Sequence, residues 1–150
     1  MVEASAQVPA FERIRPRLLE HLMAVRASFD PALARADDAR ARAQLTALVT
    51  QLGTFLATGD VALHRGALQS MLVQRGRAAG GAAQLVSTLV GVGDLAARVA
   101  VEQLGDDGHD LAIAITRRTA TTVRLCSELL VEELGQRAGQ RAVLATWGAR

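Results

Sequence analysis

Apolar residues recur along this chain every three or four positions, which is the spacing of one face of an α-helix. The first stripe carries a proline in its middle. Either a short turn precedes a helix that starts at Arg15, or the helix bends at Pro16. The segment before residue 9 has no such pattern. The first stripe consists of Phe11, Ile14, Leu18, Leu22, Val25 and Phe29.

Capping residues predict where the next helices begin and end. Asp30-Pro31 is typical of an N-cap followed by proline at the first helical position, which predicts a second helix over about residues 31–57. Residues 58–60 are Thr-Gly-Asp. The glycine suits a left-handed C-terminal position and the aspartate suits the next cap, so a third helix is expected over about residues 61–79.

Glycine pairs separate the remaining helices. Gly80-Gly81 ends the third helix, and a fourth is predicted over about residues 82–104, where apolar residues again step by three and four. Residues 105–108 read Gly-Asp-Asp-Gly and form a turn. A fifth helix is expected over about residues 109–134.

The fifth predicted helix is apolar on two sides. Val123, Leu130 and Leu134 share one side, and Leu125 and Leu129 share another. A helix that is apolar on two sides is normally buried on two sides. One side is therefore expected to face the core, and the other to face a partner such as a second subunit.

The pattern predicts an all-α fold in a single domain of five helices, arranged as a globin-like stack or an antiparallel bundle. Strand-like alternation is missing, and aromatic residues make up only 3% of the chain. Residues 1–8 are expected to form a disordered lead, residues 9–135 the helical domain, and residues 136–150 a basic tail or the end of the last helix. The predicted core consists of Leu48, Leu52, Leu68, Leu85, Leu89 and Val92.

Charge does not indicate a nucleic-acid partner. The 17 basic residues are all arginine, which is typical of GC-rich bacterial coding, and 15 acidic residues leave a net charge of +2. Arg and Asp alternate over residues 35–40, as on a solvated helix face, whereas a phosphate-binding surface needs clustered positive charge. Neither a signal peptide nor an uncharged apolar stretch of about 18 residues is visible, so we expect a cytoplasmic protein without a membrane partner.

One glycine motif resembles a nucleotide-binding fingerprint. Residues 91–96 fit G-x-G-x-x-A, but such a loop requires a preceding strand in a βαβ unit, and none is predicted. Glycine inside a helix costs about 1 kcal/mol relative to alanine. We therefore interpret Gly91 and Gly93 as positions where another helix approaches closely, or where the helix bends.

The residues that carry chemistry do not form a catalytic or metal-binding pattern. His21, His64 and His109 have no His or Cys three or four positions away, so no metal site is predicted. His64 is expected to be a surface or boundary residue, although it is the only plausible axial ligand if haem binds. Cys126 lies in an apolar helical run and is expected to be a buried small hydrophobe.

Enzymatic activity is not expected, and no cofactor is predicted. The chain has no G-x-S-x-G or P-loop motif, and Ser70, Ser87 and Ser127 lie within apolar helical stripes. Arg75, Arg77, Arg117 and Arg118 could form an anion-binding patch, but a solvated charged face is the more common role for such residues.

The order of elements resembles the N-terminal sensor domain of RsbR-type stressosome proteins, which has a haem-less globin-like fold. The resemblance covers about residues 10–135. A leucine-rich first helix precedes a second that ends in the sequence of residues 55–60, and a third ends in Arg-Gly-Arg-Ala-Ala-Gly-Gly over residues 75–81. An apolar helix, an acidic turn and a long last helix follow.

The resemblance implies a homodimer formed through the first and last helices, which passes a signal to a bacterial signalling protein. We assign Leu18, Leu22, Leu125 and Leu129 to the dimer interface. Members of that family carry a C-terminal regulatory domain. The present sequence ends at Arg150, so the output passes to a separate protein or the sequence is an excised module. The alternative function is a sensor of haem or another apolar small molecule.

Overall fold

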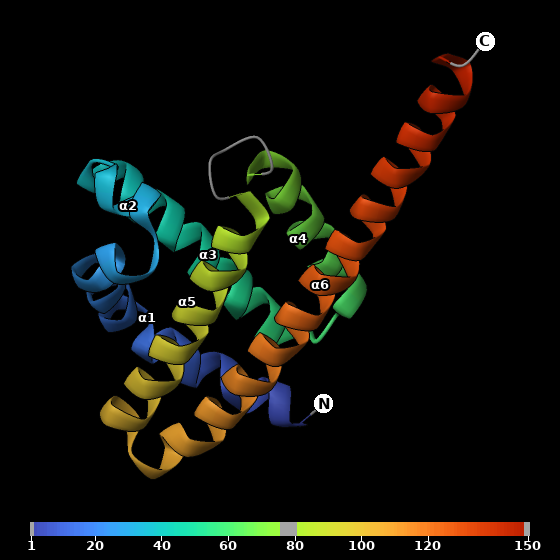
Figure 1. The fold of residues 1–150 in the computed structure, drawn as a ribbon. Helices are drawn as coiled ribbons and strands as arrows, with labels where there is room; N and C mark the ends of the chain where they lie inside the picture. The colour runs from blue at the N-terminus through green and yellow to red at the C-terminus, as the bar shows by residue number, and fades with distance from the viewer. Residues whose placement is uncertain (1, 76–80, 149–150) are drawn as a thin grey trace.

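The computed structural model describes residues 2–75 and 81–148, and these fold as a single all-α domain (Figure 1). The prediction of an all-α domain is confirmed, but the helices number six among the described residues. They are α1 (Val2–Phe29), α2 (Pro31–Arg35), α3 (Asp38–Thr58), α4 (Val61–Arg75), α5 (Gly81–Leu104) and α6 (Asp106–Gly148).

Helix α1 begins earlier than the sequence predicted. It starts at Val2 and includes the segment expected to be a disordered lead, because the Glu, Ala and Gln residues of that segment are good helix formers. Pro16 lies within α1 on its exposed side and does not divide it. The inner side of the helix follows the predicted stripe from Phe11 to Leu22, whereas Val25 is exposed.

The predicted second helix is in fact two helices. Asp30 caps α2 by accepting hydrogen bonds from two backbone N–H groups, and the chain becomes extended at Ala36. Asp37 then caps α3, because its side chain accepts a hydrogen bond from the backbone N–H of Arg40 at 2.8 Å. The alternating charges over residues 35–40 concealed this second cap. An aspartate competes with the helix for backbone N–H groups wherever the chain can turn.

Helix α5 lies at the centre of the fold and contacts α1, α3, α4 and α6. Its length and mean hydropathy of 1.3 would allow it to cross a membrane, but core helices of globular domains have the same properties. The predicted end of the preceding helix, over residues 76–79, lies outside the described residues. Helix α4 is described as far as Arg75.

Two glycines set the distance between α5 and α6. A Cβ atom at Gly93 would lie 2.1 Å from the Thr119 hydroxyl oxygen, and one at Gly108 would lie 2.0 Å from the carbonyl oxygen of Ala100. Neither distance is sterically possible. The interpretation of Gly93 as a site of close helix approach is therefore confirmed, and Gly108 plays the same role in the first turn of α6.

The core consists of two clusters. The larger joins α1, α2, α3, α5 and the first half of α6, and the smaller joins α4 and α5 to the middle of α6. Four of the six predicted core residues are buried: Leu48, Leu68, Leu85 and Val92. The other two, Leu52 and Leu89, are half-buried and pack against the core clusters. The larger cluster includes Phe11, Leu18, Leu22, Leu45 and Ile115, and the smaller consists of Leu68, Leu72, Leu85, Leu125, Cys126 and Leu129.

Candidate functional site

The four residues assigned to a dimer interface are buried within the single chain. Leu18 and Leu22 are fully enclosed, and Leu125 and Leu129 are 3% and 6% exposed. The first pair packs in the larger cluster and the second pair in the smaller. That assignment is therefore corrected: a second subunit cannot reach these side chains while the domain stays folded, because α3, α4 and α5 already cover them.

His64 is also buried, which corrects the expectation of a surface or boundary residue. Its ring stacks on Phe55 with centroids 4.0 Å apart, and its Nε2 atom lies 2.8 Å from the Thr122 hydroxyl. Arg118 covers the Phe55 ring, with its guanidinium carbon 4.8 Å from the ring centroid. Helices α3, α4 and α6 thus meet at this histidine.

Burial lowers the pKa of His64 below its ordinary value of 6.5, and the nearby Arg118 charge lowers it further. The neutral imidazole is therefore favoured in the folded state. Below pH 6.5 the unfolded chain takes up a proton at this residue before the folded chain does. Folding stability is then lost as the pH falls through the interval between the two pKa values.

We expect wild-type stability to fall as the pH is lowered below 6.5, by up to about 1.4 kcal/mol for each pH unit until the lower pKa of the folded state is reached. Urea unfolding followed by circular dichroism measures this slope. The His64→Phe variant keeps an aromatic ring against Phe55 but cannot titrate, so its slope should be shallower. Equal slopes in the two proteins would contradict the assignment.

The space beside His64 is too small for haem. A cavity of about 20 Å³ lies between α3, α4, α5 and α6, with His64, Thr119 and Thr122 among its lining residues. Such a volume holds about one water molecule, whereas drug-sized ligands occupy roughly 300–1,000 Å³. The Nε2 atom that would bind iron is also engaged by Thr122. The residues of this conformation therefore do not fit a haem group.

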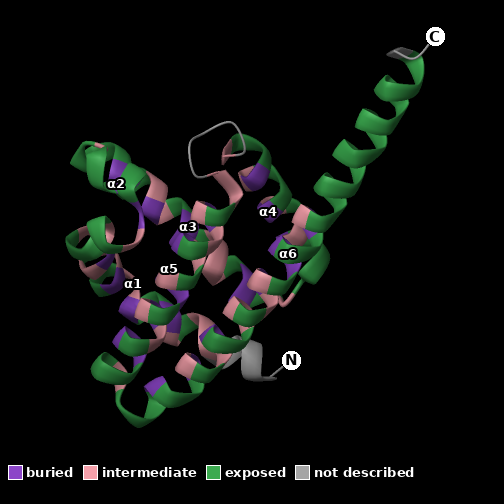
Figure 2. Cartoon of the chain, viewed as in Figure 1, coloured by how far each residue is buried: buried purple, intermediate pink, exposed green. Residues whose placement is uncertain are grey.

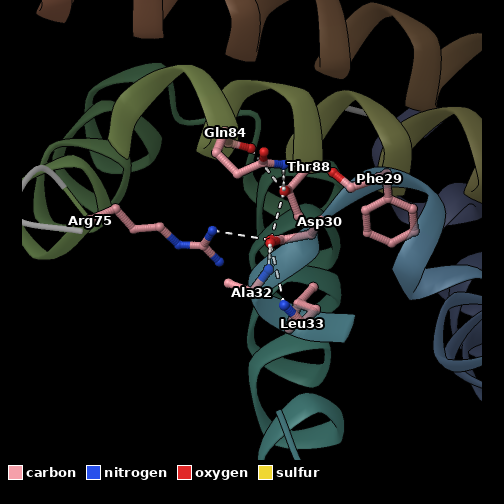
Figure 3. Close-up of polar contacts among 7 residues, drawn as sticks. All are labelled: Phe29, Asp30, Ala32, Leu33, Arg75, Gln84 and Thr88. Carbon is pink, nitrogen blue, oxygen red and sulfur yellow. Dashed lines mark hydrogen bonds and ion pairs between the residues drawn. The ribbon is translucent and has the colours of Figure 1, made fainter. Parts of the chain in front are cut away.

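A second polar cluster centres on Asp30, which is fully buried (Figure 3). One carboxylate oxygen accepts hydrogen bonds from the backbone N–H groups of Ala32 and Leu33, at 3.0 and 3.4 Å. The other oxygen accepts from the Arg75 guanidinium at 3.1 Å and from the Thr88 hydroxyl at 2.9 Å. This single side chain therefore joins the start of α2 to α4 and α5.

Both carboxylate oxygens of Asp30 have hydrogen-bond partners within the protein. Burial alone would raise the pKa of Asp30, but hydrogen bonds from Thr88, Arg75 and Leu33 outweigh burial and lower it. Gln84 extends the cluster by donating to the carbonyl oxygen of Phe29 at 2.6 Å. Since the carboxylate is ionised and its partners are in place, the cluster offers neither a general acid nor an open anion site.

The arginines grouped as a possible anion-binding patch have different partners. Arg75 pairs with Asp30, and Arg118 covers Phe55. Arg117 is exposed, and Arg77 lies outside the described residues. The structure therefore gives Arg75 and Arg118 separate roles in packing the domain.

Metal and thiol chemistry find no support in the part of the chain that the structure describes. No group of three His, Cys, Asp or Glu side chains there is suited to a metal ion. Cys126 is fully buried, as predicted, and burial raises the pKa of its thiol. A thiol with a raised pKa is a weak nucleophile at neutral pH.

The most prominent surface feature is the outer half of α6, residues 131–147. Every residue of this segment is exposed, and the segment projects from the body of the domain (Figures 1 and 2). The residues predicted to be a tail or the end of the helix are helical as far as Gly148. The most exposed apolar side chains here are Val131, Leu134, Leu144 and Trp147, at 69%, 63%, 70% and 77%.

A groove of about 340 Å³ lies at the base of this projecting segment. Helix α4 contributes Leu72 and Val73, and α6 contributes Leu129 together with Glu132 and Glu133. Val73 is 63% exposed, so the apolar wall of the groove is open to solvent. Of the residues that the sequence placed on the two apolar sides of the last helix, Leu125 and Leu129 are buried and Leu134 is exposed; the other two, Val123 and Leu130, are half-buried.

Comparison with protein-family models, with curated proteins and with solved structures found no match.

Proposed function

We propose that this chain is a non-enzymatic regulatory module that binds another polypeptide and relays a signal to it, with the outer half of α6 as its binding element. The observation that carries the proposal is the projecting segment 131–147, which is helical, exposed at every residue and carries several apolar side chains. In proteins most of the stability of a helix comes from packing of its apolar face, so a bare apolar helical segment favours a partner.

A continuous helix connects this segment to the interior. Helix α6 contains 43 residues, and the part before residue 131 packs against α1, α3, α4 and α5. Ile115 and Leu125 lie in the two core clusters on the same helix that bears Trp147. A shift of the core against α6 would therefore move the outer half as one rigid element.

Two further elements of the proposal come from the sequence. The resemblance to RsbR-type sensor domains supports a homodimer with a globin-like arrangement and a bacterial signalling protein as partner. The location that we propose, the cytoplasm, is likewise the one expected from the sequence.

The second candidate function is a small-molecule sensor. The polar side chains of His64, Thr119 and Thr122 around the small cavity favour it. Because the cavity holds about one water molecule, a ligand such as haem could enter only if the surrounding helices moved apart. A Soret band that appears when haem is added and is lost in His64→Ala would support this alternative.

Native mass spectrometry of the untagged protein from its own host tests the proposal. We expect a mass of two copies, or of one copy with another polypeptide, and no small molecule. A bare monomer would overturn the proposal. A monomer that carries a retained small molecule would establish the sensor alternative instead.

A further inference from the structure

Helix α4 is attached to the rest of the domain at three points along its length. At its start, the imidazole of His64 enters the interior. In its middle, Leu68 and Leu72 pack in the smaller cluster. At its end, Arg75 pairs with the buried carboxylate of Asp30 at 3.1 Å. Of these four α4 side chains, the histidine is the one whose charge changes near neutral pH.

The hydrogen bonds around His64 assign its neutral tautomer. The Thr122 hydroxyl donates its one hydrogen to the carbonyl oxygen of Arg118 at 2.9 Å. Thr122 must therefore accept from His64, so the imidazole carries its hydrogen on Nε2 and donates it across the 2.8 Å contact. A second proton can then be added only at Nδ1.

The packed position of His64 does not accommodate a proton on Nδ1. Among the described residues no acceptor is hydrogen-bonded to this atom. The residue is 6% exposed, so water reaches the ring poorly. The new N–H would be a buried donor without an acceptor, whereas in solvent it is bonded to water. Protonation therefore favours a conformation in which the imidazole leaves the interior.

The charges around His64 increase this penalty. From α6, the guanidinium of Arg118 lies over the same Phe55 ring on which the imidazole stacks, so an imidazolium would be repelled. Helices α3 and α5 contribute uncharged residues to the space beside the imidazole. They are Leu48, Gln51 and Leu52 from α3, and Leu89, Val92 and Gly93 from α5.

The carboxylates nearest along the chain and on α6 are engaged elsewhere. Asp60 caps the start of α4 by accepting a hydrogen bond from the backbone N–H of Leu63 at 3.0 Å. Glu128 and Glu132 of α6 both pair with Arg65, at 3.9 and 2.6 Å. Within the described residues, no carboxylate forms an ion pair with His64 that would compensate the added charge.

We infer that His64 makes α4 a proton-dependent flap: when the imidazole takes up a proton, α4 separates from α6 and exposes the smaller cluster while the larger cluster stays folded. The division of the core supports a local opening. The larger cluster contains no buried residue from α4, whereas the smaller cluster depends on Leu68 and Leu72. Loss of the α4 contacts therefore leaves the packing of α1, α3 and α5 in place.

Resting on the proposed function, this step makes acidification a signal that the module can relay. Arg65 of α4 pairs with Glu132, which belongs to the projecting segment. Leu72 and Val73 of α4 line the groove at the base of that segment. Separation of α4 removes these contacts and so changes the surface from which the outer half of α6 projects.

The single cysteine reports the separation. Cys126 is fully buried in the smaller cluster. A dithiodipyridine reagent labels thiols in acid as well as at neutral pH. The labelling rate of the native protein, divided by that of the urea-unfolded chain at the same pH, gives the fraction of molecules with an accessible thiol. We expect this fraction to rise up to about tenfold from pH 7.5 to pH 5.5, because the released imidazole regains its ordinary pKa of 6.5.

Substitutions of His64 test whether the imidazole takes up the proton. His64→Gln keeps an N–H donor for Thr122 and His64→Phe keeps a ring against Phe55, but neither side chain titrates. In both variants the accessible fraction should change less than about twofold over this pH range, whatever its value at pH 7.5. His109→Gln, at an exposed histidine of α6, is the matched control and should keep the wild-type response. A wild-type response in the His64 variants would overturn the inference.

Arg118→Gln tests the repulsion directly. Without the guanidinium, the packed imidazole accepts a proton more readily, so the accessible fraction should depend less steeply on pH than in the wild type. A role of Arg118 in packing alone would change the labelling by the same factor at every pH. That result would refute the part assigned to the charge of Arg118.

Urea distinguishes separation of α4 from global unfolding. Release of one helix exposes little surface, so the labelling rate at pH 5.5 should stay nearly constant in urea far below the unfolding midpoint. A rate that rises with urea as steeply as the global unfolding constant would show that the thiol is reached only in the unfolded chain. The flap would then be excluded.

These outcomes are separable from the failure of the proposed function. Labelling follows α4 in the isolated chain, so a bare monomer with the expected pH response keeps the flap and removes the proposed function. A chain that binds another polypeptide but is labelled equally at both pH values keeps the proposed function and removes the flap.

Discussion

Gly108→Ala is expected to destabilise the domain by about 3 kcal/mol, the upper range for overpacking in a well-packed interior. The added Cβ atom would lie 2.0 Å from the carbonyl oxygen of Ala100 and 2.6 Å from its carbonyl carbon. Both are backbone atoms of α5, so no side chain can rotate away. The two helices would have to separate at the turn, and the packing of Leu111 against α5 would loosen.

Thermal unfolding followed by circular dichroism measures this effect. For a domain of this size a loss of 3 kcal/mol lowers Tm by roughly 6–12 °C. Gly66→Ala is the matched control, because Gly66 lies within α4 and a Cβ atom there meets nothing within 4 Å. That change should raise stability by about 0.5–1 kcal/mol through helix propensity. Equal effects at the two positions would refute the close approach of α5 and α6.

Asp30→Ala is expected to cost about 3 kcal/mol, which is near the lower limit for removing one partner of a buried ion pair. The change leaves two backbone N–H groups of α2 without a cap and removes the acceptor of the Thr88 hydroxyl. It also leaves Arg75 without its carboxylate. Arg75 is 24% exposed and can turn partly towards water, which keeps the loss from being larger.

Urea unfolding at pH 7 measures the loss, with Asp37→Ala as the control. Asp37 caps α3 from an exposed position, so its removal should cost only about 1 kcal/mol. The pKa of Asp30 is lowered in the folded state, so its contribution is present above the unfolded value of 3.8 and is lost as the pH falls below it. In Asp30→Ala the free energy of unfolding should therefore decrease less steeply than in the wild type as the pH falls below 3.8, which is the acid limb of the stability curve. An unchanged acid limb would contradict the assignment.

The helical class of the fold was determined by the sequence alone, because a helix requires only local spacing. The stripe from Phe11 to Leu22 specifies which side of α1 is buried, and Asp30, Gly59 and Gly105 specify where the chain changes direction. The predicted turn at residues 105–108 is wrong beyond Gly105, because α6 already begins at Asp106. These signals act over three or four residues, so they can be recognised in the sequence without knowledge of the tertiary contacts. Asp37 was missed for a related reason, since alternating charges suit a helix face and a cap equally.

Tertiary structure alone decided what the polar residues do. Nothing near His64 in the sequence indicates that Phe55 and Thr122 enclose it, because these residues meet only when α3, α4 and α6 pack. Apolar spacing likewise shows that a helix has two buried sides but not what covers each one. The smaller cluster, to which α4 and α5 contribute, buries Leu125 and Leu129, whereas Trp147, on the same helix, stays 77% exposed. The position of the exposed surface thus depends on which other helices pack along α6.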